Sequence, residues 1–333
     1  MPPCAARMAG EGRDAMDIKQ LKALVTVAEV GSVTRAATVL HLVQPAVTRQ
    51  IRTLEEELGV PLFERTRQGM RPTEAGAAVV ERARRALHEL ERARAEVRPT
   101  PGEVSGIVTV GLLESTLGLL AEPLVTAMRE AHPGVQLRVM TAYSGHLQQW
   151  LDDGDLDLSL LYNLDRAPSL NVRPLVRERL WVAAPPAAGL RAERPVPFAD
   201  AAARPLVMPT SGHALRALIE SAAARAGAHI EVAAQTNSMP VQKQLARAGH
   251  GWTILPGVGI AEDVAAGELS AAPLCEPAAW RSIVLGTPRT GRTPPAVNVV
   301  AQELVRQVNA AVESGRWPSA RLPETEDRAA GEQ

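Results

Sequence analysis

Residues 44–65 read QPAVTRQIRTLEEELGVPLFER, and this stretch decides the fold of the first part of the chain. At the roughly 100° per residue of an α-helix, one narrow arc carries Val47, Ile51, Leu54 and Leu58. The adjoining arc carries the amide, hydroxyl and guanidinium groups that read base edges and hold phosphates in a DNA major groove. These groups belong to Gln44, Thr48, Arg49 and Arg52, with Pro45 beside them in the first turn. By itself, the pattern fits either a DNA-reading helix or an ordinary solvated helix face.

Shorter apolar patterns precede and follow this stretch. The spacing of apolar residues predicts helices over 17–30 and 33–40, ahead of the helix over 44–58. A three-residue turn, 41–43, separates the last two helices. Short helix, tight turn and longer helix form the layout of a helix-turn-helix, here at about residues 33–52. A compact, turn-rich segment over 61–72 comes next.

A long helix is predicted over 73–97, with Thr73 as its N-cap. Its apolar residues recur at alternating spacings of four and three, which is a heptad-like seam: Val79, Ala83, Ala86, Leu90, Ala93 and Val97. The pattern fits a coiled coil or an amphipathic helix that lies on its own domain. The prolines and the glycine of 98–103 predict a hinge after this helix.

The first 76 residues carry a family resemblance. From Met16 to Gly76 the chain resembles the DNA-binding domain of LysR-type regulators, above all in QPAV-T-RQI-x-x-LE-x-x-LG-x-PLF-x-R. The resemblance implies a winged helix-turn-helix over 16–73, after a flexible leader over 1–15. It also implies that the DNA contacts come from the third helix and the wing, through Gln44, Pro45, Thr48, Arg49, Arg52, Arg65, Arg67 and Arg71.

Three positions depart from the family pattern. Val43 stands where a Ser usually caps the third helix, Gln68 stands where the wing often carries Arg, and Pro72 replaces a usual Leu. The loss of the cap is expected to cost about 0.5–2 kcal/mol of helix stability. The resemblance further implies that the helix over 74–97 pairs two copies of the chain. The chain is therefore expected to form a homodimer or homotetramer. Its expected partners are double-stranded promoter or operator DNA that is partly palindromic, and RNA polymerase.

The pattern changes after residue 104, where strand-like runs alternate with helices of ten or more residues. Such alternation predicts an α/β architecture with a parallel sheet. The predicted strands are Ile107–Leu113, Val135–Thr141, Leu156–Tyr162, Pro205–Met208, 229–236, Trp252–Leu255 and Ile283–Thr287. The predicted helices cover 117–131, 144–153, 213–227, 239–249 and 295–313.

This half also resembles a known domain. The motif GIVTVGLLEST at 106–116, followed by HPGVQLRV and by SG-x-L with W-L-x-x-G-x-L-D-L-S-L, is similar to the LysR-type effector domain. That domain is in turn similar to type 2 periplasmic binding proteins, with two α/β lobes and a ligand between them. The resemblance implies an effector-binding domain over 104–313. We expect one lobe over 104–176 and 288–313, a second over 177–287, and a flexible tail over 314–333.

Two predicted helix starts carry hydroxyl groups that could face an anion. Ser115 and Thr116 open one helix, and Thr210 and Ser211 open another; free backbone N–H groups at such starts favour negative charge. We therefore predict a small carboxylate or aromatic acid as effector, although each hydroxyl fits equally well as a simple N-cap. Further candidates by position are Ser144, Asn163, Asn237, Ser238 and Thr253.

Composition narrows the classes of function. Residues 1–100 hold 16 Lys and Arg against 13 Asp and Glu, whereas the rest hold 20 against 24, a mild asymmetry that agrees with DNA contact by the first part. The two cysteines, Cys4 and Cys275, are far apart, so a disulfide or a cysteine metal site is not expected. We expect a cytoplasmic protein without a signal peptide, a membrane segment, a cofactor or a metal.

Two other classes of protein were weighed against a regulator. An enzyme would require a Gly-rich phosphate loop, a nucleophile elbow or a metal-ligand pair, and none is found; the acidic run Asp152–Asp157 lacks the bidentate Glu of a calcium loop. A solute-binding transport protein would require export and has no use for a DNA-reading helix. The sequence therefore predicts a ligand-responsive, DNA-binding regulator that is not an enzyme.

Overall fold

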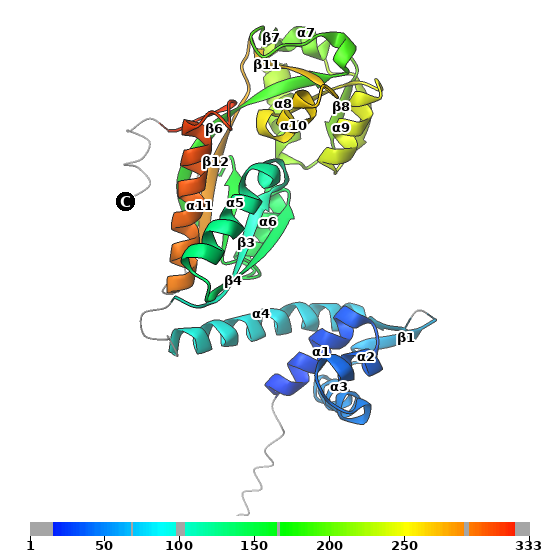
Figure 1. The fold of residues 1–333 in the computed structure, drawn as a ribbon. Helices are drawn as coiled ribbons and strands as arrows, with labels where there is room; N and C mark the ends of the chain where they lie inside the picture. Colours follow the sequence, from blue (N-terminus) through cyan, green and yellow to red (C-terminus); the bar gives the residue numbers. More distant parts are fainter. Residues whose placement is uncertain (1–15, 68, 98–103, 165–166, 290–292, 324–333) are drawn as a thin grey trace, which may run out of the picture. The chain divides into compact units, whose positions relative to one another are not determined.

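The computed structural model divides the chain into two compact units, Met1–Val97 and Arg98–Gln333 (Figure 1). It describes residues 16–67, 69–97, 104–164, 167–289 and 293–323. The predicted leader over 1–15, the hinge over 98–103, Gln68 of the wing and the last ten residues of the predicted tail lie outside this description.

The first unit is a helical domain with a small hairpin. Its elements are α1 (Ile18–Val30), α2 (Val33–Val39), α3 (Gln44–Leu58), β1 (Phe63–Thr66), β2 (Gly69–Pro72) and α4 (Glu74–Val97). The predicted arc of α3 is confirmed at Val47, Ile51 and Leu54, which lie in the core of this unit. Leu58, the last residue of the helix and of the predicted arc, is exposed. The order of elements confirms the predicted winged helix-turn-helix, with the turn-rich segment folded as an antiparallel hairpin.

Local hydrogen bonds set the ends of the first helices. Asp17 and Gln20 form a capping box at the start of α1, and Gly31 ends this helix in the left-handed conformation. The Ser32 side chain accepts from the backbone N–H of Arg35 and caps α2. Val43 occupies the N-cap position of α3 and makes no side-chain hydrogen bond there. This confirms the prediction that α3 lacks a side-chain cap.

Hydrogen bonds to the backbone of the hairpin hold the wing against the helices. Glu55 Oε1 accepts from Leu62 N at 2.7 Å and from Phe63 N at 3.3 Å, and this bond fixes the chain between α3 and β1. The carbonyl of Gly31 accepts from Met70 N at 2.9 Å. A Cβ on Gly69 would lie 2.4 Å from that carbonyl oxygen, so this close approach requires glycine.

Helix α4 packs part of its heptad-like pattern against its own unit. Thr73 caps the helix as predicted, since its Oγ1 accepts from Gly76 N at 2.9 Å. Val80 and the predicted seam residue Ala83 are buried in the unit's own core, and Val79 packs against them. Ala86, Leu90 and Ala93 are exposed, while the side chain of Val97 lies outside the described part. The first half of the predicted seam is therefore used within the chain.

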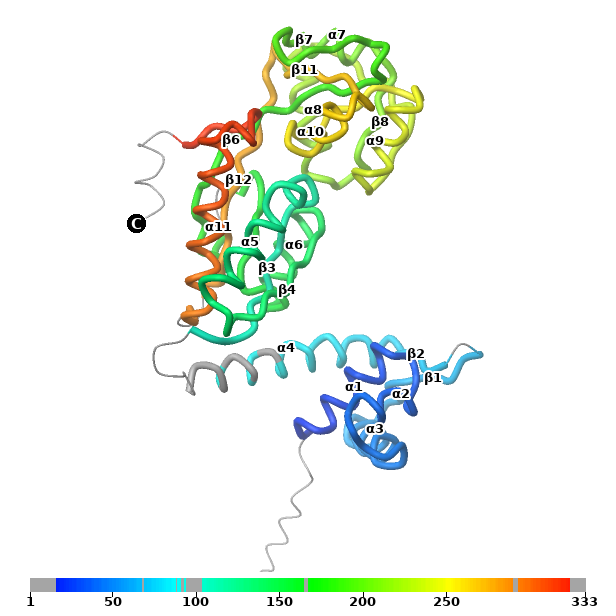
Figure 2. The backbone as a smooth tube through the Cα atoms, viewed as in Figure 1, coloured from blue at the N-terminus to red at the C-terminus, as the bar shows by residue number. Residues whose placement is uncertain are grey.

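The second unit has two lobes built on one continuous run of strands (Figure 2). The strand order is β4-β3-β5-β12-β6-β10-β8-β9. Strand β6 (Leu170–Ala184) serves both lobes: its first part pairs antiparallel with β12 (Trp280–Pro288), and its last residues pair with β10 and β11. Neither β6 nor the full length of β12 was predicted, because long crossing strands lack the flanking helices that mark a βαβ unit.

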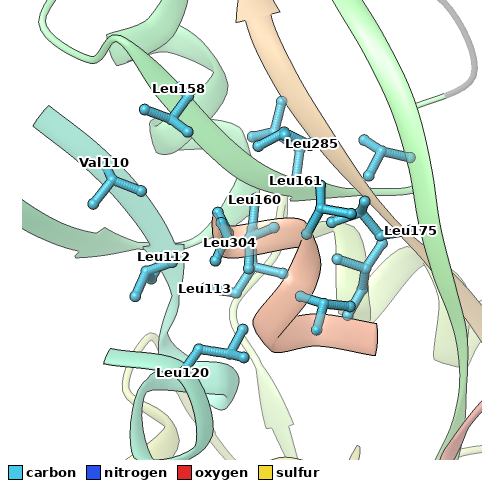
Figure 3. Packing of buried hydrophobic residues seen from close by; sticks show 14 of the residues in the cluster. Val110, Leu112, Leu113, Leu120, Leu158, Leu160, Leu161, Leu175, Leu285 and Leu304 are labelled. Atoms are coloured by element: carbon cyan, nitrogen blue, oxygen red, sulfur yellow. The ribbon is translucent and has the colours of Figure 1, made fainter. Parts of the chain in front are cut away.

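The first lobe is a mostly parallel sheet with helices packed on it. Its elements are β3 (Gly106–Leu113), the 3-10 turn η1 (Glu114–Thr116), α5 (Leu117–Ala131), β4 (Val135–Ala142), α6 (Ser144–Asp152), β5 (Leu158–Tyr162) and α11 (Pro295–Glu313). Strand β3 runs parallel to both β4 and β5. Figure 3 shows Leu304 of α11 among the leucines of the central strands, with Leu112 and Leu160 close by.

The second lobe repeats the arrangement on a smaller scale. Its elements are β7 (Val196–Pro197), α7 (Phe198–Ala202), β8 (Leu206–Pro209), α8 (Ala214–Ala226), β9 (Val232–Thr236), α9 (Met239–Arg247), β10 (Trp252–Pro256), α10 (Gly257–Ala265) and β11 (Ser270–Cys275). Strand β8 runs parallel to β9 and β10. The predicted strands over 205–208, 229–236 and 252–255 and the predicted helices over 213–227 and 239–249 are confirmed, whereas α10 and β11 were not predicted.

Two predicted boundaries are wrong. Ile283–Leu285, assigned to the second lobe from the sequence, are buried in the core of the first lobe, so the change of lobe occurs near Ala279 rather than at residue 287. The tail predicted to fray from residue 314 includes Trp317, which is fully buried, and β13 (Ala320–Arg321), which pairs with β6. Among the described residues, no helix combines the length and apolar character needed to cross a membrane.

Candidate DNA-binding surface and ligand pocket

The predicted DNA contacts all lie on the surface of the first unit. Those on α3 and those on the hairpin and its turn are exposed: Gln44, Pro45, Thr48, Arg49, Arg52, Arg65, Arg67 and Arg71. On α3 they occupy the arc that adjoins the buried stripe of Val47, Ile51 and Leu54. An exposed polar helix edge next to a basic hairpin has the shape and chemistry to enter a major groove and hold the flanking phosphates.

The side chains on this edge differ in the hydrogen bonds and ion pairs that they already make within the protein. Gln44 Nε2 donates to Thr48 Oγ1 at 3.2 Å, so the two predicted base-reading groups are already aligned with each other. Arg52 Nε lies 2.7 Å from Glu56 Oε1 in an exposed ion pair, which competes with a phosphate contact. Arg49 makes no ion pair with any residue that the structure describes, and its guanidinium is available to DNA.

The second unit has a pocket of about 420 Å³, part of it open to solvent, at the junction of the two lobes. The first lobe contributes residues from the ends of β3, β4 and β5, and the second contributes the starts of α8, α9 and α10. The lining residues are Leu113, Glu114, Ser115, Ala142, Tyr143, Tyr162, Pro209, His213, Leu215, Met239, Gln242, Leu255, Pro256 and Arg281. Carboxyl ends of parallel strands are the usual place for a ligand in such sheets.

A buried ion pair forms one wall of this pocket. Arg281 donates through Nε and Nη2 to Glu178 Oε2, at 2.8 and 2.6 Å, and both side chains are almost fully buried. Arg281 Nη2 also donates to Ser115 Oγ at 2.7 Å. Glu178 Oε1 accepts from the indole of Trp317 and the hydroxyl of Ser319. The network therefore fixes Ser115 from both crossing strands.

Aromatic rings and a histidine form a second wall. Leu215 N donates to His213 Nδ1 at 3.0 Å, so His213 caps α8, and Tyr162 Oη lies 3.4 Å from the same nitrogen. Burial, with the nearby charge of Arg281, lowers the pKa of His213 to about 4. The neutral ring then carries its proton on Nε2, which is buried without a hydrogen-bond partner among the described residues. Burial also raises the pKa of Tyr143 to about 12, and both phenols stay neutral.

Glu114 brings a carboxylate to the rim between the lobes. Its Oε2 accepts from Met239 N, the first residue of α9, at a long 3.4 Å. Burial raises the pKa of Glu114, and the contact with Met239 and the charge of Lys243 oppose this shift only in part. The Lys243 ammonium is held by Asp263, at 2.6 Å. Glu114 is thus a carboxylate without a close ion-pair partner in the described part of the chain.

Of the nine predicted effector residues, Ser115 alone lines the pocket. Thr116, Ser144 and Thr253 are buried and hydrogen-bonded within the protein: Thr116 Oγ1 donates to Leu113 O, Ser144 Oγ accepts from Tyr162 N, and Thr253 Oγ1 donates to Val207 O. Asn163 ties the end of β5 to β12 through Ser282. Their hydroxyl and amide groups are committed to the fold.

The predicted opening of α8 is corrected by the structure. Thr210 and Ser211 precede the helix, whose N-cap is His213, so they do not present the expected helix start. Ser238 caps α9 and Asn237 is exposed beside it. The residues that the sequence analysis missed are Glu114, Tyr143, Tyr162, His213, Gln242 and Arg281. A signal existed for the first of these, because Glu114 directly precedes Ser115 at the end of a buried strand.

No group of three or more metal-ligating side chains comes together among the residues that the structure describes. The family model described as "Bacterial regulatory helix-turn-helix protein, lysR family" matches residues 18–77, and that described as "LysR substrate binding domain" matches residues 101–309. These two matches cover both units described above.

Similar proteins extend over nearly the whole chain. The HTH-type transcriptional regulator BbuR of Bordetella bronchiseptica is 32% identical over 303 residues, which cover 91% of this chain and 93% of that protein. The DNA-binding transcriptional dual regulator OxyR of Escherichia coli is 31% identical and covers 74% and 80%. Among solved structures, full-length CbnR complexed with its target DNA superposes with a TM-score of 0.66 at 24% identity, covering 88% of this chain and all of that one.

Proposed function

Because this chain belongs to the LysR family of transcriptional regulators, we propose that it binds DNA through the exposed edge of α3 and the β1–β2 hairpin. The chain is a DNA-binding transcriptional regulator with an effector-binding domain. The observation that carries the proposal is the position of Gln44, Thr48 and Arg49, which are exposed on the arc of α3 that adjoins its buried stripe. Amide and guanidinium groups in this position are those that discriminate bases.

The test is a comparison of two charge-removing variants. Sites are first selected from a pool of random double-stranded DNA with the full-length wild-type protein. Affinity for the selected site is then measured over a series of salt concentrations, and it should fall steeply as counterions are released. Arg49→Ala should weaken binding by about 5- to 150-fold, the value of one good base contact, with an unchanged melting temperature.

The matched control is Arg82→Ala, which removes the same charge from an exposed position on α4. We expect this variant to bind the selected site within a few-fold of wild type. Equal affinity of the Arg49→Ala variant and the wild type would contradict the assignment of the reading edge. Absence of salt-sensitive DNA binding by the wild type would contradict the function itself.

We also propose that the pocket between the lobes holds the effector and that the effector changes DNA affinity. The proposal is supported by the lining, which comes from both lobes, so that an occupant contacts both at once. A ligand that binds one arrangement of the lobes better than another shifts the population toward it. Of the residues predicted from the sequence, Ser115 keeps a place in this site.

The carboxylate or aromatic acid predicted from the sequence finds little support in this pocket. The expected pair of hydroxyl-bearing helix starts is not formed at α8, and the guanidinium of Arg281 is already bound to Glu178. Thiol-based sensing of hydrogen peroxide is not supported either, although a Dickeya chrysanthemi relative, 30% identical, is named a hydrogen peroxide-inducible genes activator. A thiol sensor requires an accessible thiolate, and burial raises the pKa of Cys275, the single cysteine of the described residues.

Assembly and the remaining partners are inferred from the family. We propose a homodimer or homotetramer that binds partly palindromic DNA and acts on RNA polymerase at the promoter, in the cytoplasm, where bacterial DNA lies. Within α4, Ala86 and Leu90 are exposed and available for pairing, whereas Ala83 is buried in its own unit. Size-exclusion chromatography with light scattering on the full-length chain tests the stoichiometry.

A further inference from the structure

The charges around the pocket decide which class of ligand fits it. Arg281 is the one cation among the described residues that line the pocket. Two of its three donor nitrogens, Nε and Nη2, bind Glu178, and its guanidinium carbon lies 5.3 Å from the ring centre of Tyr162. Both side chains are buried, and the carboxylate of Glu178 neutralises the positive charge of Arg281. The pocket therefore has no spare cation for an acid.

The negative charge of Glu114 is not balanced in the same way. Its contact with Met239 N is 3.4 Å long, and its other oxygen has no partner among the described residues. Lys243 lies near it, but the ammonium group donates to Asp263 at 2.6 Å and to the Gly259 carbonyl at 3.2 Å. A half-buried carboxylate with an open acceptor position is stabilised by a donor that carries positive charge.

The rest of the lining is apolar or aromatic. Leu215, Met239 and Leu255 contribute aliphatic and thioether surface, and Tyr143 contributes an aromatic ring. The edge of one ring of the Tyr143–His213 pair meets the face of the other, at a centroid distance of 4.1 Å. Aromatic faces attract an organic cation, and aliphatic walls bind its hydrocarbon body. A carboxylate placed here would instead lie beside Glu114 and be repelled.

We propose that the inter-lobe pocket binds a small organic amine, with its ammonium group on Glu114 and its apolar body between Leu215, Met239 and the tyrosine rings. This inference rests on the proposed function of the pocket as the effector site. Glu114 comes from the first lobe and Met239 from the second, so an ammonium bound at Glu114 lies where the lobes meet. The amine would thereby act on the contact that sets their separation.

Three probes of nearly equal size test the class of ligand: benzylamine, benzyl alcohol and benzoate. Binding to the full-length protein is measured by isothermal titration calorimetry and by the shift in melting temperature. Benzylamine should bind and raise the melting temperature, benzyl alcohol should bind more weakly, and benzoate should bind least. Glu114→Gln should lower benzylamine affinity by roughly 10- to 100-fold, the value of a charge-assisted hydrogen bond, and should leave benzyl alcohol almost unaffected.

The control variant is Glu130→Gln, which removes an exposed carboxylate from α5 and should change none of the three affinities. Three results would overturn the proposal: tighter binding of benzoate, equal benzylamine affinity of the Glu114→Gln variant and the wild type, or no benzylamine binding to the wild type at millimolar concentration. If benzoate binds and changes DNA affinity, the pocket is an effector site but the amine inference is wrong. If the wild-type protein does not bind DNA but binds benzylamine through Glu114, the proposed DNA-binding function is wrong and the amine inference stands.

Discussion

Glu178 shows how much a single buried residue can organise. Its carboxylate accepts from the guanidinium of Arg281, from the indole of Trp317, from the Ser319 hydroxyl and from the backbone N–H of Val258. It thereby ties β6, β12, α10 and the C-terminal segment to one point, next to the pocket. A buried carboxylate is tolerated because every lone pair has a donor, and it becomes costly as soon as the cation is removed.

Replacing Arg281 with Met should therefore destabilise the second unit strongly. The change leaves Glu178 buried and without its cation, and we expect a loss of about 3–5 kcal/mol in the free energy of unfolding. Urea denaturation followed by circular dichroism measures it. The double variant Arg281→Met with Glu178→Gln should recover part of the loss, because the uncompensated charge is gone.

The control is the pair between Arg306 and Glu303 on α11, three positions apart, in which the Arg306 side chain is exposed and the Glu303 side chain is partly buried. Arg306→Met should lower the urea midpoint far less than Arg281→Met, because the carboxylate that it leaves behind still reaches solvent. If the Arg281→Met variant were as stable as the Arg306→Met variant, the ion pair would not hold the wall of the pocket.

At the scale of elements, the start of a helix depends on more than its local sequence. Helix α3 begins where the sequence predicts, although Val43 supplies no cap, because its apolar stripe is buried against α1 and α2. Helix α8 begins after Thr210 and Ser211, and its cap is the imidazole of His213. Packing of this ring on Tyr143 places the cap in a buried setting that no local pattern reveals.

The buried cap makes stability depend on pH. Burial holds the pKa of His213 at about 4, against 6.5 in the unfolded chain. As the pH falls from about 6.5 to about 4, the unfolded chain takes up a proton that the folded chain refuses, so the free energy of unfolding decreases. We expect His213 to account for roughly 1–2 kcal/mol of this decrease, after allowance for partial exposure.

Asn is a good N-cap that does not titrate, so His213→Asn should keep α8 and remove this part of the pH dependence. The measurement is the urea midpoint at several pH values between 4 and 7 for both proteins. Parallel pH profiles for the variant and the wild type would mean that His213 is not held neutral by the fold.

At the scale of the whole second unit, two crossing strands and the C-terminal segment join what the sequence separates. Strand β6 passes from one lobe to the other, and β12 returns beside it. Trp317 is fully buried against the first lobe's core, and its indole reaches Glu178 on β6. The segment after α11 is thus a structural part of the junction that carries the pocket.

Trp317→Ala should destabilise the chain by about 3–5 kcal/mol, because it leaves a large cavity and removes one donor from Glu178. Trp317→Phe keeps most of the ring volume and loses the indole donor alone, so we expect a smaller loss of about 1–2 kcal/mol. Thermal and urea unfolding of the two variants separate packing from hydrogen bonding. If the Trp317→Ala variant were as stable as the wild type, the segment after α11 would not contribute to the fold, as the sequence-based prediction of a flexible tail had it.

The first unit could be predicted almost completely. Its helices bury their own periodic stripes against sequence neighbours, so the positions of Val47, Ile51 and Leu54 decide both the core and the exposed edge with Arg49. The seam of α4 stays open between pairing and packing on its own domain, because Ala83 satisfies a heptad and an intramolecular core equally well. Periodicity tells which face of a helix is apolar, and it does not tell which partner covers that face.

The location of the pocket between the lobes could be predicted from the sequence, but the charge and polarity of its lining could not. Sequence alone determined the helix-turn-helix layout, the alternation of strands and helices and the position of Ser115 at the end of a buried strand, because these follow from local periodicity. The wing and the two lobes came from the family resemblance. Tertiary structure decided that Arg281 is neutralised by Glu178, 103 residues away in the sequence, and that Glu114 is not neutralised in the same way. The charge that a ligand meets depends on which residues lie within a few ångströms of one another, and only the packing of distant segments sets those distances.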